Sequence, residues 1–166
     1  MKVIKVLILG KSNVGKSSLI NYITQNHTTL VSHKLHATRI STYHGYKCKD
    51  YYFHFIDTPG TSITESNLLA QAMKIHASKH ITNCDIVILL TQPQKTYDYE
   101  HRILNELRQS NKNYIICVNK ADIDLKNIFS LSLKNKLRID KYSLISLKKN
   151  IGISELIDEM IKKYSV

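Results

Sequence analysis

Cysteine, glycine and proline are all scarce in this chain of 166 residues. The three cysteines, Cys48, Cys84 and Cys117, stand far apart and form no C-x-x-C pair. This spacing argues against a disulfide framework or a cysteine-based zinc site and fits a reducing compartment. The 5 glycines and 2 prolines form no linker, repeat or low-complexity tract. Because an ordinary domain has roughly 100–200 residues, we expect one domain over residues 1–166.

Long apolar runs and acidic residues are also in short supply. The longest strongly apolar run, residues 86–90, is far too short to cross a bilayer. The N-terminal stretch alternates too regularly for a signal peptide. The sequence therefore predicts no transmembrane segment and a cytoplasmic protein. Lysine and arginine number 24 against 13 acidic residues, a net charge of +11, which indicates an anionic partner such as RNA, DNA, acidic lipid or a nucleotide.

What is present is an alternation of strand and helix patterns. Apolar, β-branched stretches predict strands, listed as residues 2–9, 39–47, 51–56, 85–91, 113–118 and 142–146. Amphipathic or breaker-free stretches predict helices, listed as residues 16–25, 66–80, 97–109, 125–136 and 153–164. The second and third strands flank a polar tip and predict an antiparallel hairpin. The pattern favours an α/β fold with a doubly wound, mostly parallel six-stranded sheet and helices on both faces.

The first predicted strand ends in Gly10-Lys-Ser-Asn-Val-Gly-Lys-Ser17, a G-x-x-x-x-G-K-S motif between a strand and a helix. Its glycines let consecutive backbone N–H groups face a phosphate, and the helix that follows directs its positive end at the same anion. Lys16 would reach the outer phosphates, and the Ser17 hydroxyl would bind Mg²⁺. The residues expected around the phosphates are Ser12, Asn13, Val14, Gly15, Lys16, Ser17 and Ser18.

A second motif, Asp57-Thr-Pro-Gly60, follows the third predicted strand. A carboxylate at a strand end beside a phosphate loop can hold the Mg²⁺ shell, directly or through water. Gly60 would let a backbone N–H approach the γ-phosphate. Taken alone, Thr-Pro-Gly is also an ordinary turn sequence. Together with the phosphate loop, the motif favours a metal and phosphate role.

A third motif, Asn119-Lys-Ala-Asp122, follows the fifth predicted strand. The Asp122 carboxylate can accept two hydrogen bonds from the N1–H and N2–H₂ edge of guanine, which adenine lacks. Asn119 can brace the loop and the base, and the stem of Lys120 can lie along the base plane. The alternative is that Asp122 or Asp124 caps the predicted helix that begins at Leu125.

These three motifs, in this order, resemble the GTPase branch of the P-loop fold, and within it the bacterial Era/TrmE/EngA group. The segment 10–21 is typical of that group. Ala37-Thr38-Arg39 resembles its switch I motif, which implies that Thr38 binds Mg²⁺ and the γ-phosphate in the triphosphate state. Ser146-Leu147-Lys148 resembles the last guanine loop, usually Ser-Ala-Lys, whose middle backbone N–H contacts guanine O6.

The resemblance implies a Mg²⁺-dependent switch that binds and hydrolyses GTP and signals to a protein partner that the sequence does not name. Its catalytic residues would be Lys16, Thr38, Gly60 and Asn13. Thr61 stands where many Ras-like enzymes have a water-positioning Gln, so we expect slow intrinsic hydrolysis. In several similar GTPases an Asn at the position of Asn13 helps hold K⁺. The alternative is that Asn13 only shapes the turn, because Asn tolerates left-handed backbone.

Two alternatives to a hydrolysing switch stay open at this point. One is a GTP- and GDP-binding module with negligible turnover that acts through a partner surface. The other is a ribosome- or RNA-associated factor. Era proteins that bind ribosomal RNA carry a separate RNA-binding domain after the GTPase domain, and we expect residues 1–166 to hold the GTPase domain without it. Basic residues concentrated in the last third could form an RNA- or membrane-facing patch or simply a solvated face. They are Lys134, Lys136, Arg138, Lys141, Lys148, Lys149, Lys162 and Lys163.

Overall fold

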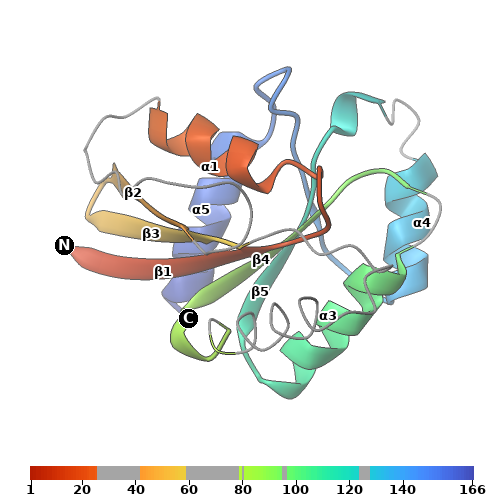
Figure 1. The fold of residues 1–166 in the computed structure, drawn as a ribbon, viewed down its shortest axis with the longest axis horizontal. Coiled ribbons are helices and arrows are strands. Elements are labelled where there is room, and N and C mark those ends of the chain that lie inside the picture. The colour runs from red at the N-terminus through yellow and green to blue at the C-terminus, as the bar shows by residue number, and fades with distance from the viewer. Residues whose placement is uncertain (26–41, 59–78, 80, 95–96, 124–127) are drawn as a thin grey trace.

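The structure is a computed structural model, and it describes residues 1–25, 42–58, 79, 81–94, 97–123 and 128–166. Within these residues a sheet of six strands has the order β2-β3-β1-β4-β5-β6 (Figure 1). The strands are β1 (Lys2–Leu9), β2 (Thr42–Cys48), β3 (Tyr51–Asp57), β4 (Ile86–Thr91), β5 (Asn113–Val118) and β6 (Ser143–Leu144). The β2–β3 pair is antiparallel and the other pairs are parallel.

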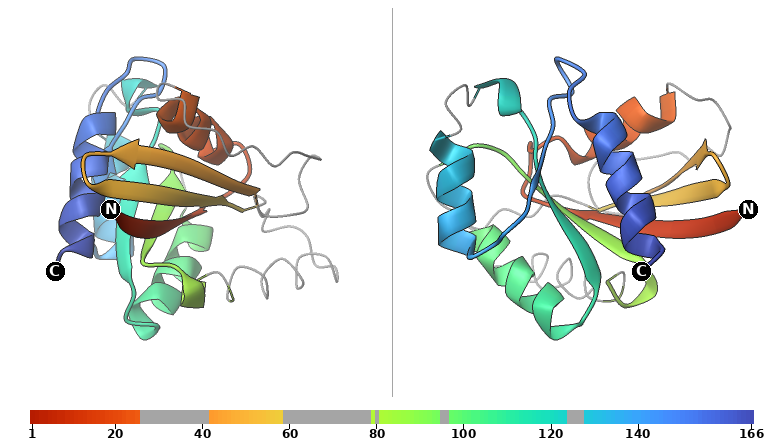
Figure 2. Two further views of the ribbon diagram at one scale, coloured as in Figure 1. Left: turned by 90° about the vertical axis from the view of Figure 1, so that its left-hand side faces the viewer. Right: turned by 180° about the vertical axis from the view of Figure 1, so that it is seen from behind.

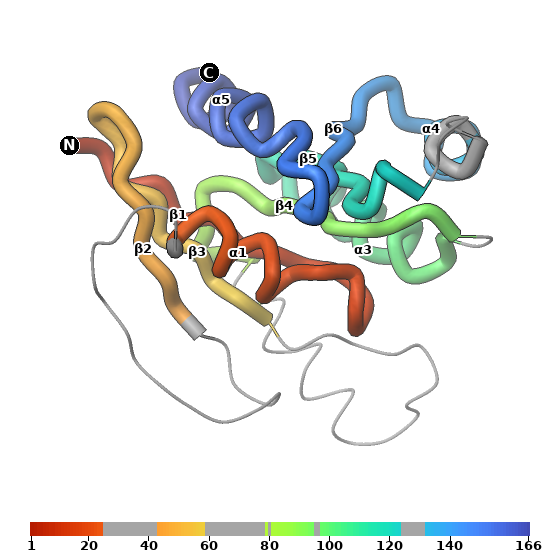
Figure 3. Tube along the Cα trace, turned by 90° about the horizontal axis from the view of Figure 1, so that it is seen from above, coloured from red at the N-terminus to blue at the C-terminus, as the bar shows by residue number. Residues whose placement is uncertain are grey.

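Helices cover both faces of this sheet. They are α1 (Lys16–Gln25), α3 (Asp98–Gln109), α4 (Ile128–Leu137) and α5 (Ile153–Tyr164), with a short 3₁₀ helix, η1, at Ala121–Ile123. Figure 2 shows α1 and α5 on one face and α3 and α4 on the other. Seen from above in Figure 3, the β2–β3 hairpin forms one edge of the sheet and α4 lies beyond the other.

Two apolar cores explain why the central strands are apolar along their whole length. Successive residues of β1 face opposite cores. Ile8 lies in the core shared with α1 and α5, and Leu9 lies in the core shared with α3 and α4. All six residues of β4 are buried. A parallel strand that is buried on both faces cannot alternate apolar and polar residues, and this is the pattern that the sequence carries.

The predicted fold class is confirmed: a mostly parallel six-stranded sheet with one antiparallel pair and helices on both faces. Several predicted bounds are wrong, most of them by one residue: β2 ends at Cys48, β3 ends at Asp57, β4 begins at Ile86 and α3 begins at Asp98. The last strand is only Ser143–Leu144, because Ser146 leaves it and pairs instead with Ile151. The fourth predicted helix extends one residue further, to Leu137. The predicted helix over residues 66–80 lies outside the described residues apart from Lys79, which is helical.

No helix among the described residues is long and apolar enough to cross a membrane.

Candidate functional site

The phosphate loop, residues 10–17, connects the end of β1 to the start of α1. Two residues give it its shape. Gly15 has φ of 105°, and a Cβ there would collide with Nδ2 of Asn119. Asn13 has φ of 65°, a left-handed backbone that asparagine tolerates and that the turn interpretation of this residue requires.

Lys16 lies almost fully buried inside this loop, with 6% of its surface exposed. Its Nζ donates hydrogen bonds to the carbonyl oxygens of Gly10, at 2.9 Å, and Lys11, at 2.8 Å. Burial lowers the pKa of Lys16 to about 8, and the Asp57 carboxylate opposes this shift. A buried ammonium group whose hydrogen bonds go to carbonyl oxygens gains strongly from an anion placed beside it.

The Ser17 hydroxyl donates a hydrogen bond of 2.6 Å to Asp57 Oδ2. The other carboxylate oxygen, Asp57 Oδ1, is buried and has no hydrogen-bond partner among the described residues. The next residue, Thr58, anchors this strand end because its Oγ1 donates to the carbonyl oxygen of Ile8 at 2.7 Å. A hydroxyl and a carboxylate oxygen held this close are the hard oxygen donors that Mg²⁺ prefers, so Ser17 and Asp57 fit a Mg²⁺ site.

The end of β5 is bonded directly to the phosphate loop. Asn119 is 3% exposed, and its Nδ2 donates to the carbonyl oxygen of Val14 at 3.0 Å. Lys120 Nζ reaches the carbonyl oxygen of Asn13 at 3.2 Å. The residues joined by these two hydrogen bonds are 105 and 107 positions apart in the sequence. The first and third motifs therefore form one site at the carboxyl ends of β1 and β5.

Asp122 and Ser146 meet beside this site. The Ser146 hydroxyl donates a hydrogen bond of 2.6 Å to Asp122 Oδ1. This hydrogen bond is the main reason that the pKa of the Asp122 carboxyl lies below its usual range, and the charges of Lys148 and Lys149 add to it. Asp122 lies in η1 itself. An ionised carboxylate fixed on one oxygen leaves its other oxygen available as an acceptor for a base edge.

Leu147, in the turn predicted to be the last guanine loop, lies beside the phosphate loop. Its Cδ1 is 3.9 Å from the position that a Cβ on Gly15 would take. Ser146 and Ile151 exchange two backbone hydrogen bonds of 3.0 Å, which close the turn that carries Leu147 and Lys148. The bulkier residue therefore packs beside the phosphate loop, and the backbone of the turn stays fixed.

The structure brings most of the predicted site residues together. Those placed around the carboxyl ends of β1, β3, β5 and β6 are Ser12, Asn13, Val14, Gly15, Lys16, Ser17, Ser18, Asp57, Asn119, Lys120, Asp122, Ser146, Leu147 and Lys148. Thr38 and Gly60 lie outside the described residues.

One polar cluster beside the site was missed by sequence reasoning. Glu100 in α3 is fully buried and forms an ion pair with Lys11 of the phosphate loop. The signal was available, because Glu100, Leu104 and Leu107 occupy the core-facing positions i, i+4 and i+7 of α3. An acidic residue on the buried stripe of an amphipathic helix indicates a polar partner in the core.

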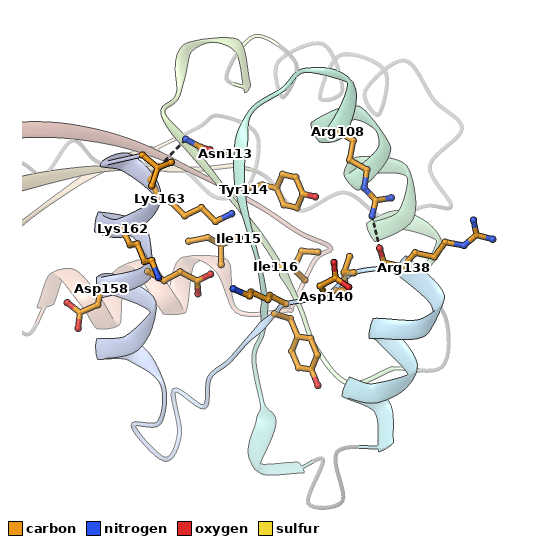
Figure 4. Close-up of a pocket in the computed structure, with 15 residues that line it drawn as sticks. Arg108, Asn113, Tyr114, Ile115, Ile116, Arg138, Asp140, Asp158, Lys162 and Lys163 are labelled. Carbon is orange, nitrogen blue, oxygen red and sulfur yellow. Dashed lines mark hydrogen bonds between the residues drawn. The ribbon is translucent and has the colours of Figure 1, made fainter.

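A separate groove of about 1050 Å³ lies at the β5 edge, between α5 and the segment that follows α4 (Figure 4). β6 pairs only with Cys117 and Val118, so residues 113–116 of β5 have no strand partner on this side among the described residues. The cationic residues that line the groove are Arg108, Arg138, Lys141, Lys162 and Lys163. It also has three carboxylates, Asp140, Asp158 and Glu159, and shares no residue with the nucleotide motifs.

Comparison with known proteins agrees with this geometry. The family model described as 50S ribosome-binding GTPase matches residues 5–120. The chain is 29% identical to GTPase Der of Agathobacter rectalis over 160 residues, which cover 96% of this chain and 36% of that protein. It is 31% identical to GTPase Era of Actinobacillus pleuropneumoniae over 117 residues, which cover 70% of this chain and 38% of that protein.

Solved structures give the same picture. Era of Aquifex aeolicus bound to GDP and AlF₄⁻ has a TM-score of 0.78 and 26% identity, and the match covers 98% of this chain and 57% of that one. Era in complex with MgGDPNP and a segment of 16S ribosomal RNA has a TM-score of 0.76 and 25% identity, with the same coverage. The chain therefore spans about a third of the length of the Der relatives and about half of the Era structures.

Proposed function

The chain belongs to the family of 50S ribosome-binding GTPases, and on that premise we propose that it binds GTP with Mg²⁺ and hydrolyses it to GDP and phosphate as a molecular switch. The observation that carries this proposal is that hydrogen bonds join the first motif to both the second and the third. Lys16, the Ser17–Asp57 pair and the Asp122–Ser146 pair all lie at or beside the carboxyl ends of strands of the one sheet, which supports a single ligand position between them. Phosphate, metal and guanine recognition therefore belong to one site.

In hydrolysis, water attacks the γ-phosphorus and the bond to the β–γ bridging oxygen breaks, leaving GDP as the leaving group. Lys16 would stabilise the negative charge on the phosphoryl group in transfer, together with the amides of the phosphate loop. Mg²⁺, when bound by Ser17 and Asp57, supplies further positive charge to the phosphates. Thr38 and the backbone of Gly60 are proposed to contact the γ-phosphate side and to be released after hydrolysis.

Guanine selection is proposed to rest on Asp122. Ser146 already occupies one of its oxygens at 2.6 Å and orients the carboxylate. A guanine N1–H and N2–H₂ edge would bring two donors to this acceptor, whereas adenine offers an acceptor at N1 and no amino group at C2. Asn119 and Lys120 support the phosphate loop under the same base.

Binding and single-turnover hydrolysis test this proposal. The chain should bind GTP and GDP far more tightly than ATP, and Lys16→Ala should abolish GTP binding. Lys2→Ala, at an exposed lysine of β1, is the matched control and should leave binding unchanged. Binding without turnover would identify a GTP-binding module rather than a GTPase, and equal affinity for ATP would refute guanine recognition.

A second candidate function is contact with RNA or the ribosome through the groove at the β5 edge. The side chains of Arg138, Lys141 and Lys162 make no hydrogen bond or ion pair with the described residues, so their charges are available to phosphates. Figure 4 draws Arg138 and Lys162 on opposite sides of the groove. The Era structure in complex with 16S ribosomal RNA supports this candidate by relationship.

Salt-dependent binding to a 16S rRNA fragment tests the second candidate. Replacing Arg138, Lys141 and Lys162 together by alanine should reduce the slope of log affinity against log salt by about 2–3, because each phosphate contact contributes roughly one. Three exposed lysines elsewhere, Lys2, Lys5 and Lys47, provide the control substitution. An unchanged slope in the groove variant would assign the basic residues to solvation.

Three further parts of the proposal follow from the family and the motifs. K⁺ is proposed to bind near Asn13 and to assist hydrolysis in place of a Gln after Gly60. The protein is proposed to act in the cytoplasm through a partner that senses the nucleotide state. Residues 1–166 are proposed to form one GTPase domain.

A further inference from the structure

A buried carboxylate lies beside the phosphate loop and belongs to none of the three motifs. Glu100 is 0% exposed, and its Oε1 accepts hydrogen bonds from Thr91 Oγ1, at 2.7 Å, and Gln94 Nε2, at 2.8 Å. Its Oε2 is also buried and has no hydrogen-bond partner among the described residues. Lys11 Nζ stands 3.8 Å from that oxygen, with its side chain 21% exposed.

The two oxygens of Glu100 are therefore satisfied in different ways. Oε1 is held by neutral donors from the end of β4 and the segment after it. Oε2 depends on the charge of Lys11, because a carboxylate removed from water is costly unless a cation or donor compensates it. The same attraction between Lys11 Nζ and Glu100 Oε2 holds the Lys11 side chain, which belongs to the phosphate loop, in place.

Lys11 also carries one of the two carbonyl oxygens that hold Lys16. Its side chain pairs with Glu100 while its carbonyl oxygen accepts the hydrogen bond from Lys16 Nζ at 2.8 Å. The preceding residue, Gly10, lies so close to β4 that a Cβ there would collide with the carbonyl oxygen of Leu90. The first part of the phosphate loop is thus pressed against β4 and tied to α3 through one ion pair.

We propose that Glu100 is a positioning residue for the phosphate loop. Through the Lys11–Glu100 ion pair it holds the backbone carbonyl that orients Lys16, and it thereby sets nucleotide affinity from a buried position that no nucleotide can touch. This inference rests on the proposed function, because its readout is GTP binding. It adds a third attachment of the loop to the two made by Asn119 and Lys120.

The test compares Glu100→Gln, Lys11→Met, Lys11→Arg and the double variant Lys11→Met/Glu100→Gln, with Glu155→Gln in α5 as an exposed control. GTP affinity, kcat and KM for hydrolysis, and the melting temperature of the nucleotide-free protein are measured for each. We expect Glu100→Gln and Lys11→Met each to weaken GTP binding by about 10-fold. Lys11→Arg, which keeps the ion pair, should stay within about twofold of the original chain.

The double variant separates positioning from simple burial. Lys11→Met alone leaves an unpaired buried charge and should lower the melting temperature by roughly 6–20 °C. Removing both charges should recover most of that loss, yet GTP affinity should stay about 10-fold weak because the loop is still untied. In these variants a rise in KM for GTP without an equal loss of kcat would show that binding, and not the chemical step, is impaired.

Two outcomes would overturn the proposal. The first is recovery of GTP affinity together with the melting temperature in the double variant. The second is GTP affinity within about twofold of the original chain in Lys11→Met, which keeps the test decisive even where Glu100→Gln does not fold. Absence of GTP binding by the unaltered chain would refute the proposed function itself. If the unaltered chain and the control Glu155→Gln both bind GTP, a loss seen in the other variants is caused by their substitutions.

Discussion

Raising the pH from about 7 to about 8.5 should weaken GTP binding by about fourfold through Lys16 alone. Burial in the phosphate loop lowers the pKa of this lysine to about 8 in the nucleotide-free protein. Only the ammonium form attracts phosphate, so the protein must hold a proton on Lys16 to bind GTP tightly. Above pH 8 most of the free protein has a neutral Lys16, so GTP binding is coupled to the uptake of a proton from solution and becomes weaker.

The magnitude follows from the difference between the free and bound states. The nucleotide phosphates place negative charge beside Lys16 Nζ, which should return its pKa to at least the ordinary value of 10.5. Affinity then falls with the protonated fraction of the free protein, by about fourfold at pH 8.5. The range stops there because guanine begins to lose its own N1 proton at higher pH.

The assay is a titration of a fluorescent GTP analogue at constant ionic strength, with Lys16→Arg as the control. The arginine guanidinium stays protonated throughout, so this variant should bind more weakly but with no slope over the same range. A flat profile for the original chain, parallel to that of Lys16→Arg, would refute the argument that Lys16 titrates in the free site.

The same shift has the opposite sign for folding. Between about pH 8 and 10.5 the unfolded chain holds the Lys16 proton more tightly than the folded chain does, so the stability of the nucleotide-free protein rises with pH in this window. The full shift corresponds to about 3 kcal/mol. Chemical unfolding should therefore give the original chain a gain in stability over Lys16→Arg as the pH is raised, while its GTP affinity falls.

The remaining predictions concern the base, the metal and the monovalent ion. Asp122→Asn should weaken GTP by a few kcal/mol, because a donor then faces a donor, and should improve binding of xanthosine triphosphate; equal GTP affinity in both proteins would remove Asp122 from base recognition. Ser17→Ala should weaken Mg²⁺-dependent binding of GDP and GTP alike, whereas Thr38→Ala should spare GDP and abolish the difference in partner binding; an equal loss for GDP would contradict the switch. Hydrolysis should be faster in KCl than in NaCl at matched ionic strength, by a factor smaller than the roughly 10³–10⁵ that an arginine finger gives. Asn13→Ala should lose the KCl advantage and keep most of its GTP affinity. Equal rates in the two salts would leave Asn13 as a turn residue.

The sequence predicts the central strands and the phosphate loop well because their signals are local. The continuous apolar runs that became β4 and β5 follow from burial on both faces. The G-x-x-x-x-G-K-S spacing carries its own geometry, since Gly15 has the positive φ that the turn requires. The final strand was predicted too long because Ser146 pairs with Ile151 and donates to Asp122 instead of continuing the sheet, and period-two patterning cannot detect either partner.

The bonds between motifs could not be predicted because they depend on which strand ends become neighbours. Nothing local to Asn119 shows that its amide will reach the carbonyl oxygen of Val14, or that Lys120, whose backbone is left-handed with φ of 58°, will reach the carbonyl oxygen of Asn13. Glu100 is similar, since its buried position is visible in the helix periodicity but its pairing with Lys11 requires α3 to pack beside β1 and β4.

These cross-links mean that much of the site is ordered before a nucleotide arrives. Lys16 already bonds to two carbonyl oxygens, Ser17 to Asp57, and Ser146 to Asp122. Binding of GTP and Mg²⁺ then adds ionic partners to groups whose positions folding has already fixed, so little conformational entropy is lost at this end of the ligand. Under the proposed function, the difference between GTP and GDP would then come from groups that contact the γ-phosphate, which is the role proposed for Thr38 and Gly60.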